Sequence, residues 1–219
     1  MSLKFFNTQS RRKEEFVPIE AGKAKLYTCG PTVYNYAHIG NFRTYVFEDV
    51  LRRHLKVKGF DLTHVMNITD VEDKIIKRAA EQGIELNQGD GSNPEAPIPL
   101  DEITEPYVQA FHEDRKALRI EDAEYYPYAT RYVQKIVDLI KRIQDAGVTY
   151  ESEGSIYFSI KKFPGYGRLS GFKIDEVVSG ARVDSDEYEK DDARDFVLWK
   201  ARKEGEGFWE TELGEGRPG

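Results

Sequence analysis

The sequence contains one cysteine among its 219 residues, and it has no long hydrophobic run. A single cysteine excludes an internal disulfide framework. The apolar runs extend over only a few residues, whereas a membrane-spanning helix needs roughly 20, so we expect no spanning segment. The opening stretch MSLKFFNTQSRRKEEF lacks the apolar core of a signal peptide and, because it contains acidic residues, does not fit a transit peptide. We therefore expect a cytoplasmic protein.

The sequence also lacks an excess of positive charge, because its formal net charge is -7. A nucleic-acid partner would have to bind a local basic patch, since the protein as a whole repels phosphate at long range. The composition does support a folded core, because 39% of the residues are hydrophobic and 12% are aromatic. Length and composition together fit one sizeable domain, or one domain that is interrupted by another.

The first third of the chain alternates between strand and helix patterns. Residues 24–29 form a short apolar run that ends at Gly30-Pro31, which predicts a buried strand stopped by a turn. Residues 41–59 predict a helix, and five apolar residues lie on one side of it: Phe42, Tyr45, Val46, Val50 and Leu51. Residues 60–69 predict a second strand, with period-two apolar residues at Phe60, Leu62, Met66 and Ile68. Two strands joined by one crossover helix should lie parallel, with ligands bound beyond their carboxyl ends.

The next helix has acidic residues at its expected start. Thr69-Asp70-Val71-Glu72 has the spacing of a capping box, in which the threonine hydroxyl accepts a hydrogen bond from the amide three residues on and the glutamate reaches back. We therefore expect a helix over residues 70–83. Asp70, Glu72 and Asp73 could be catalytic carboxylates, but acids in the first turn of a helix are more simply explained by the helix dipole.

The pattern changes in the second half. Residues 87–99 are rich in Gly, Pro, Asn and Asp and have no apolar period, which predicts an exposed loop. The clearest helix pattern covers residues 130–147, and its apolar stripe consists of Val133, Ile136, Val137, Ile140 and Ile143. Residues 148–160 predict a hairpin that turns at Glu153-Gly154.

The stretch 180–195 is too charged for a core and predicts a solvated loop, after which residues 195–200 return to a strand-like run. This change of pattern suggests a small α+β insertion over residues 120–194. The insertion would separate two parts of one α/β domain, at residues 1–119 and 195–219.

The tetrapeptide His38-Ile39-Gly40-Asn41 opens the first predicted helix. Unpaired backbone N–H groups and the positive end of the helix dipole favour a phosphate at such a position. His38 can donate to that phosphate, and Gly40 lets a flat ring approach the backbone. The alternative is an ordinary helix start with a surface histidine.

Cys29 is the only thiol of the chain. An isolated cysteine is more often a small buried hydrophobe than a ligand. The remaining histidines, His54, His64 and His112, have no spacing relative to Cys29 that predicts a metal site. The residues by themselves therefore offer one potential metal ligand without partners.

Two segments, LYTCGPTVYNYAHIGNFRTYVFEDVLRR and NITDVEDKIIKRA, closely resemble the amino-terminal half of the cysteinyl-tRNA synthetases, which are class I aminoacyl-tRNA synthetases. The resemblance continues through GSIYFSI, YGRLSG, DFVLWKARKEG and the final GRPG. Asn41 stands where many members have the second histidine of a His-Ile-Gly-His signature, and residues 87–99 are longer and more irregular than the family leads us to expect. In this family the chain continues past GRPG to further zinc ligands, a Lys-Met-Ser-Lys-Ser loop and an anticodon-binding domain, so we expect this chain to be truncated.

The resemblance implies an α/β fold, in which the Rossmann-like parallel sheet of a class I catalytic domain is interrupted by a small α+β connective insertion. It also implies an enzyme that activates L-cysteine with ATP to cysteinyl-adenylate and transfers the cysteine to tRNA(Cys). The oligomeric state stays open, and a monomer is favoured. Cys29 would be one of four protein ligands of a Zn²⁺ ion, which prefers the substrate thiolate to a hydroxyl. Gly30 and Thr69 would contact the substrate cysteine. ATP, with Mg²⁺, would bind at Gly30, Thr32, Asn35, His38, Gly40 and Asn41, of which His38 and Asn41 are the catalytic candidates.

Three other functions have to be weighed. A ligase that joins cysteine to a sugar amine shares the cysteine-zinc loop and the adenylate chemistry, but NYAHIGNFRTY and DFVLWK resemble the tRNA enzyme more closely. A nucleotidyltransferase would share the phosphate site and have no use for Cys29. The chain as it stands could also be a non-catalytic fragment that binds a nucleotide weakly.

Overall fold

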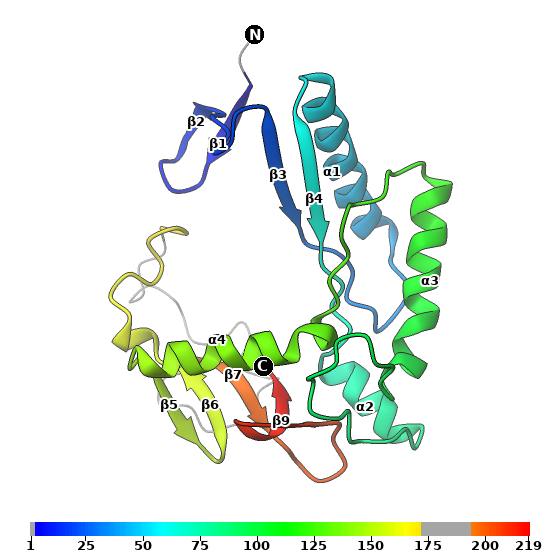
Figure 1. The fold of residues 1–219 in the computed structure, drawn as a ribbon, viewed down its shortest axis with the longest axis vertical. Coiled ribbons are helices and arrows are strands. Elements are labelled where there is room, and N and C mark those ends of the chain that lie inside the picture. Colours follow the sequence, from blue (N-terminus) through cyan, green and yellow to red (C-terminus); the bar gives the residue numbers. More distant parts are fainter. Residues whose placement is uncertain (1–2, 172–193) are drawn as a thin grey trace. The chain divides into compact units, whose positions relative to one another are not determined.

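The computed structural model of the chain describes residues 3–171 and 194–219. The chain forms two compact units (Figure 1). Unit 1 contains Met1–Val17, Asp138–Ala201 and Pro218–Gly219, and unit 2 contains Pro18–Val137 and Arg202–Arg217. Within the described ranges, no helix is long and apolar enough to cross a bilayer.

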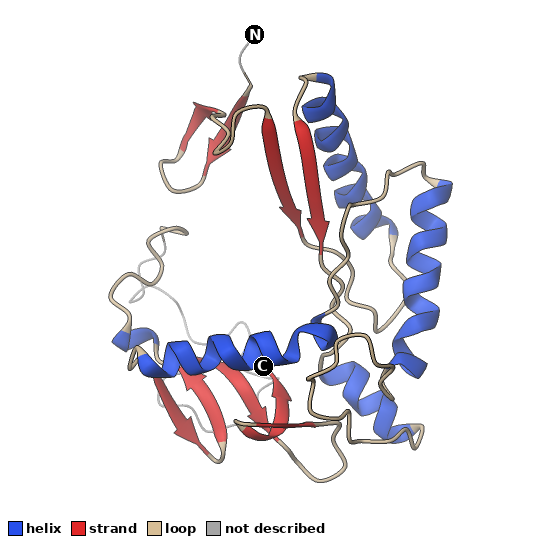
Figure 2. Ribbon diagram, in the orientation of Figure 1, coloured by secondary structure: helices blue, strands red, loops and turns tan. Residues whose placement is uncertain are grey.

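Unit 2 is built around two parallel strands joined by a helix (Figures 1 and 2). Strand β3 (Lys23–Thr28) pairs in parallel with β4 (Asp61–Met66), in a register that runs from Lys23 opposite Asp61 to Thr28 opposite Met66. Helix α1 (Ile39–Val57) forms the crossover between them. The predicted order of strand, loop, helix and parallel strand is therefore confirmed.

Strand β4 shows the predicted period-two burial. Leu62, Met66 and Ile68 are buried, and His64 is buried on the same face. At its carboxyl end, β4 and the residues after it run beside the segment 125–128. The Met66 amide donates to the carbonyl of Tyr125, and the Ile68 amide donates to that of Pro127. The carboxyl end of β4 is thus flanked on both sides by backbone.

The apolar side predicted for α1 is only partly correct. Phe42 and Tyr45 are buried and pack with Phe111 of helix α3 (Asp101–Ala117). Val46 is 42% exposed and Val50 is 59% exposed, so these two assignments were wrong. The buried side of the helix continues instead through polar residues.

These buried polar residues bind the segment that follows α3. The Arg52 guanidinium donates to both carboxylate oxygens of Glu124, at 2.8 and 2.5 Å, and Asp49 accepts from the Glu121 amide at 2.9 Å. Charged side chains can be buried when they are paired and hydrogen-bonded. Apolar side chains at residues 49 and 52 would leave the Glu121 amide and the Glu124 carboxylate without these partners. The buried face of α1 is therefore set by contacts with residues far along the chain.

Helix α2 (Asp73–Glu81) begins three residues later than the sequence suggests. The predicted capping box is wrong, because the Thr69 hydroxyl accepts from the side-chain amide of Asn67 and Glu72 makes no side-chain cap. Asp70 instead accepts hydrogen bonds from the amide and hydroxyl of Thr130. The carboxylate that the pattern assigned to a helix start thus holds the 3₁₀ turn η1 (Ala129–Tyr132), which leads into α4 (Val133–Asp145).

The helix expected over residues 130–147 is confirmed by η1 and α4, with Val133, Val137 and Ile140 buried. Residues 87–99 form no helix or strand, as predicted, but they are not exposed throughout. Gln88 is buried, and its side-chain oxygen accepts from the Leu100 amide at 3.0 Å. Strands β8 (Trp209–Thr211) and β9 (Gly214–Pro218) pair antiparallel.

Unit 1 contains two hairpins, one further strand, the second part of α4 and a short 3₁₀ helix. Strands β1 (Lys4–Asn7) and β2 (Arg12–Glu15) pair antiparallel, as do β5 (Thr149–Ser152) and β6 (Ser155–Phe158). Glu153 and Gly154 have φ of 48° and 77° at the turn, so the predicted hairpin is confirmed. Strand β7 (Phe196–Ala201) confirms the strand predicted over residues 195–200 and pairs antiparallel with β6. A short 3₁₀ helix, η2 (Ile160–Lys162), follows β6. The predicted solvated loop lies outside the described residues up to residue 193.

Candidate functional site

The two motif segments meet at the carboxyl ends of the parallel strands. Cys29 directly follows β3, and Asn67 and Thr69 follow β4. Two backbone hydrogen bonds join the segments, because the Val33 amide donates to the Thr69 carbonyl at 3.0 Å and the Thr69 amide donates to the carbonyl of Pro31 at 2.9 Å. The structure therefore brings four of the predicted site residues to one edge: Cys29, Gly30, Thr32 and Thr69.

Gly30 is required by a close approach of backbone to backbone. A Cβ atom at this position would lie 1.9 Å from the carbonyl oxygen of Asn67 and 2.8 Å from Cγ of Met66. The Gly30 amide also faces the Asn67 side chain, 3.4 Å from its oxygen. Asn67 thus contacts Gly30 and Thr69, a role that the sequence reasoning missed although the residue lies within the NITD motif.

Cys29 is exposed, and its thiol lies 3.7 Å from the carbonyl of Gly30. Within residues 3–171 and 194–219, no group of three or more His, Cys, Asp or Glu side chains could hold a metal ion. The described residues therefore supply a single candidate ligand and do not make a zinc site by themselves.

A buried polar cluster lies directly behind Cys29. Oγ1 of Thr28 is 2.9 Å from Nε2 of His64, which is only 3% exposed. Burial raises the pKa of Glu48, and a hydrogen bond with the Thr28 hydroxyl opposes that rise. Burial lowers the pKa of His64, with a further contribution from the charge of Arg52. Burial therefore favours the neutral form of the His64 imidazole, beside the last residue of β3.

Tyr45, on α1, interacts with Glu48 and Cys29, and its pKa is strongly shifted. Burial, with the Glu48 carboxylate and Cys29 adding to it, raises the pKa of Tyr45 to about 12. Its phenol hence stays protonated at neutral pH, so it can donate a hydrogen bond but does not supply a negative charge.

The start of α1 is capped by its own side chains. Nδ1 of His38 accepts from the amides of Gly40 and Asn41, at 3.0 and 3.3 Å, and Oδ1 of Asn41 accepts from the His38 amide at 3.0 Å. The expectation that these two amides are unpaired was therefore wrong. Because Nδ1 is an acceptor, the neutral imidazole carries its hydrogen on Nε2, which leaves an exposed donor.

Gly40 also has a different role from the one expected. A Cβ atom at residue 40 would lie 2.8 Å from Cε1 of His38. The flat ring that approaches this glycine in the structure is thus the histidine's own imidazole, and the glycine allows that ring to lie over the first turn. Thr32 and Asn35 are exposed on the same loop, where Oδ1 of Asn35 accepts from the Tyr36 amide at 2.9 Å.

Two of the three acidic residues before and in the first turn of α2, Asp70 and Asp73, have structural partners. Asp70 is 1% exposed, and burial raises its pKa although the hydrogen bonds from Thr130 oppose the rise. Asp73 pairs with Arg217 at 2.6 Å. These contacts support the structural explanation of these two carboxylates over the catalytic one.

Comparison with known proteins places this site in a family. A family model described as "tRNA synthetases class I (C) catalytic domain" matches residues 15–219. The chain belongs to this family. Asn41, where the sequence departs from the family's signature, is the residue that closes the capping box of α1.

Among the curated relatives, the chain is 51% identical over 219 residues to a protein named "Cysteine--tRNA ligase" from Solibacter usitatus (strain Ellin6076), covering 100% of this chain and 44% of that protein. It is 50% identical over 220 residues to a protein of the same name from Koribacter versatilis (strain Ellin345), covering 100% and 42%. The corresponding values for Protochlamydia amoebophila (strain UWE25) are 48% over 223 residues, 99% and 44%. The chain therefore spans less than half the length of these relatives.

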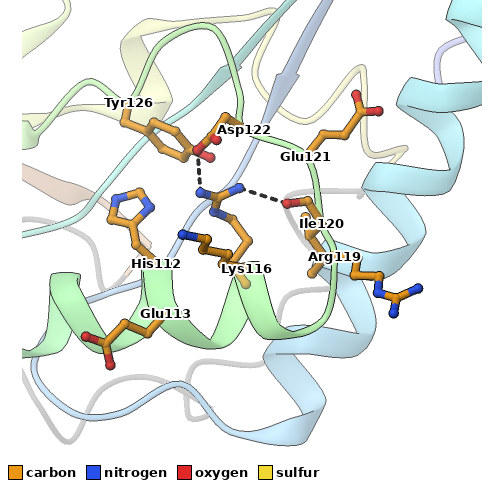
Figure 3. Close-up of a pocket in the computed structure, with 9 residues that line it drawn as sticks. His112, Glu113, Lys116, Arg119, Ile120, Glu121, Asp122 and Tyr126 are labelled. Carbon is orange, nitrogen blue, oxygen red and sulfur yellow. Dashed lines mark hydrogen bonds and ion pairs between the residues drawn. The ribbon is translucent and has the colours of Figure 1, made fainter.

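A cavity of about 620 Å³ lies elsewhere in unit 2, where α3 ends (Figure 3). Arg115 donates to the carbonyl of Ile120 at 2.8 Å and pairs with Asp122, and His112 meets the ring of Tyr126 edge-on. Burial lowers the pKa of His112, and Arg115 adds to this effect. None of the residues predicted for the cysteine or the nucleotide lines this cavity, so it is separate from the edge described above.

Proposed function

We propose that this chain carries the cysteine-binding and ATP-binding loops of a cysteine--tRNA ligase. The observation that supports this most is the junction of Cys29, Gly30 and Thr69 at the carboxyl ends of two parallel strands, followed by a helix whose first residues are His38 to Asn41. In open α/β sheets this edge is where ligands bind. The proposed location is the cytoplasm and the proposed state a monomer, with residues 120–194 as the connective insertion between 1–119 and 195–219.

The proposed reaction has two steps. An oxygen of the cysteine carboxylate attacks the α-phosphorus of ATP, the bond to the leaving pyrophosphate breaks, and cysteinyl-adenylate forms. A hydroxyl of the terminal adenosine of tRNA(Cys) then attacks the activated carbonyl and releases AMP. Neither step needs a strong general base from the protein, so positioning and charge stabilisation at the phosphates are the main demands.

The proposed roles of the nucleotide loop follow from its contacts. Nε2–H of His38 is free to donate to a phosphate oxygen, because Nδ1 is engaged by the helix amides. Asn41 fixes that imidazole through the His38 amide. Thr32, Asn35 and Gly40 line the same loop, and Mg²⁺ would enter with the triphosphate.

The proposed roles at the other end concern the amino acid. Thr69 would contact its polar groups, beside the Gly30 backbone that Asn67 holds. Cys29 is proposed as one ligand of a zinc ion that distinguishes cysteine from serine, but the described residues do not complete such a site. We therefore expect the purified chain, after dialysis against a weak chelator, to retain well under one equivalent of zinc by elemental analysis, since one thiolate cannot reproduce the affinity of a four-ligand site. Near-stoichiometric zinc that is lost in Cys29→Ser would contradict this expectation.

Ligand binding by the purified chain tests the proposed function. ATP should bind saturably in isothermal titration calorimetry, and a non-hydrolysable sulfamoyl analogue of cysteinyl-adenylate should bind more tightly, because it occupies both halves of the site. Absence of saturable binding for both ligands would overturn the proposal. Cysteine-dependent exchange of pyrophosphate into ATP would identify a complete activating site. ATP binding without exchange would favour the second candidate, a non-catalytic nucleotide-binding module.

A further inference from the structure

The segment Tyr34–Ala37, between the two ends of the proposed site, is held from outside the loop by two helices. Its only described hydrogen bond within the loop is the local one between Asn35 and the Tyr36 amide. Nη1 of Arg78, on α2, donates to the Tyr34 carbonyl at 2.7 Å and to the Tyr107 hydroxyl, on α3, at 2.6 Å. One guanidinium nitrogen therefore joins the loop to both helices.

Aromatic contacts strengthen this junction. The Arg78 guanidinium lies 5.5 Å from the centre of the Tyr107 ring, and Tyr36 meets the same ring edge-on at 5.1 Å. One turn earlier on α2, Nζ of Lys74 lies 4.4 Å from the centre of the Tyr34 ring. Lys74 and Arg78 are four residues apart and so share one face of the helix. That face contacts the Tyr34 carbonyl and the Tyr34 ring, whereas the Tyr36 ring packs on Tyr107 of α3.

We propose that Arg78, with Lys74 and Tyr107, positions the Tyr34–Ala37 segment so that Asn35 and His38 meet the nucleotide. This inference rests on the proposed function. Arg78 is a positioning residue that acts through the Tyr34 carbonyl. A loop fixed before the ligand arrives binds it more tightly, because less ordering accompanies binding.

The positioning role also explains how the two motif segments, which are separate in the sequence, act on one loop. The first segment carries the loop, and the second, NITDVEDKIIKRA, carries Asn67 and Thr69 at one end of the loop and Lys74 and Arg78 at its middle. The helical half of the second segment has no other role in the proposed reaction. Its contacts with Tyr34 give it one.

The test uses amide hydrogen exchange and ATP titration on the chain. In Arg78→Gln, exchange of the Tyr36 amide, which has the one described hydrogen bond within this segment, should become at least about tenfold faster, and the Kd for ATP should rise about tenfold, as expected for the loss of one charge-assisted hydrogen bond. Exchange in β3 and β4 should stay unchanged. Arg78→Lys, which keeps the charge, should recover part of both effects. Lys77→Gln, a neighbouring exposed position on α2, should stay within twofold of the parent chain.

Tyr107→Phe keeps the ring and removes only the hydroxyl, so it decides the question if Arg78→Gln does not fold. It should raise the loop exchange rate and the Kd together, by a smaller factor. Unchanged loop exchange, faster loop exchange with an unchanged Kd, or an equal loss of protection in β3 and β4 would each overturn the positioning role. If the parent chain binds no ATP, the proposed function fails, and the loop exchange still shows whether Arg78 holds the segment.

Discussion

The two halves of the loop between β3 and α1 are held in different ways. The first half, Cys29–Val33, is joined to the end of β4 by backbone hydrogen bonds and by the close contact of Gly30 with the Asn67 carbonyl. The second half, Tyr34–His38, is held by side chains, through Arg78 and through the capping box of His38. The first half therefore leaves no room for a side chain at residue 30, whereas the conformation of the second half depends on a few side-chain hydrogen bonds. Substitutions at Gly30 and His38 test this difference, and a third, at Glu124, tests the charged contact that holds the helix following the loop.

The largest effect is expected from Gly30→Ala. The added Cβ would overlap the Asn67 carbonyl, so the two strand ends must move apart, and we expect a loss of about 2–4 kcal/mol in the free energy of unfolding. Urea unfolding followed by circular dichroism measures this loss. Gly165→Ala, where the nearest atom to the added Cβ lies at 3.5 Å, is the matched control and should change stability by less than about 0.5 kcal/mol. Equal stabilities of the two variants would show that the backbone contact does not constrain the first half.

An intermediate effect is expected from His38→Ala, on ligand binding. Removal of the Nε2 donor should weaken ATP binding by on the order of 1.5–3 kcal/mol, and loss of the cap should lower stability by about 1 kcal/mol. Calorimetric titration and thermal unfolding measure the two quantities separately. His38→Asn should restore the cap without restoring ATP affinity, since asparagine caps helices well but offers no imidazole donor. His54→Ala, at the other end of the same helix, is the control, and unchanged ATP affinity in His38→Ala would remove this residue from the site.

The smallest effect concerns acid, in the charged cluster that holds α1 to the segment after α3. Burial by itself would raise the pKa of Glu124, but hydrogen bonds from Arg52 and the His64 amide lower it to about 2. A carboxylate with a lowered folded-state pKa stabilises the fold above its ordinary value near 4.5, and this stabilisation is lost as the pH falls from about 4.5 to 2. With solvent screening at a side chain that is 34% exposed, the loss is on the order of 1–2 kcal/mol.

The measurement is urea unfolding between pH 2 and pH 7. Glu124→Gln should be less stable than the parent at neutral pH, and the difference should shrink at pH 2. Glu81→Gln, at the exposed end of α2, should follow the parent at every pH. A constant difference between Glu124→Gln and the parent across this range would mean that the Glu124 carboxylate is not preferentially stabilised in the fold.

The strands, their parallel pairing and the crossover helix could be predicted, because period and turn residues are local signals. The buried face of α1 could not, since Arg52 and Asp49 are buried by partners near residues 121–124, about 70 positions away. The start of α2 was misassigned for the same reason, because Thr130 binds the carboxylate of Asp70. Whether residues 69–72 form a capping box or a loop therefore depends on hydrogen bonds with residues that are distant in the sequence.

The arrangement of the candidate site residues could likewise be predicted only in part. Their meeting at one sheet edge follows from the parallel topology, which the sequence predicts. The self-capping of His38 had a local signal that was missed, namely a polar Asn41 three residues after a residue that can accept hydrogen bonds. The contacts of Asn67 with Gly30 and of Arg78 with Tyr34 join separate parts of the chain, so no local pattern could reveal them.

The pairing of β3 with β4 across α1 has a consequence for the order in which the chain folds. The hairpins β1–β2 and β5–β6 close over short turns, and such hairpins form within about 1–10 μs. The parallel pair can form only after the chain has continued through α1 to β4, because non-local contacts follow loop closure. During synthesis on the ribosome, the stretch around Cys29 therefore emerges early and acquires its final shape late. Until β4 is made, the edge of β3 that will pair with it exposes its backbone N–H and C=O groups, and unpaired strand edges of this kind favour aggregation.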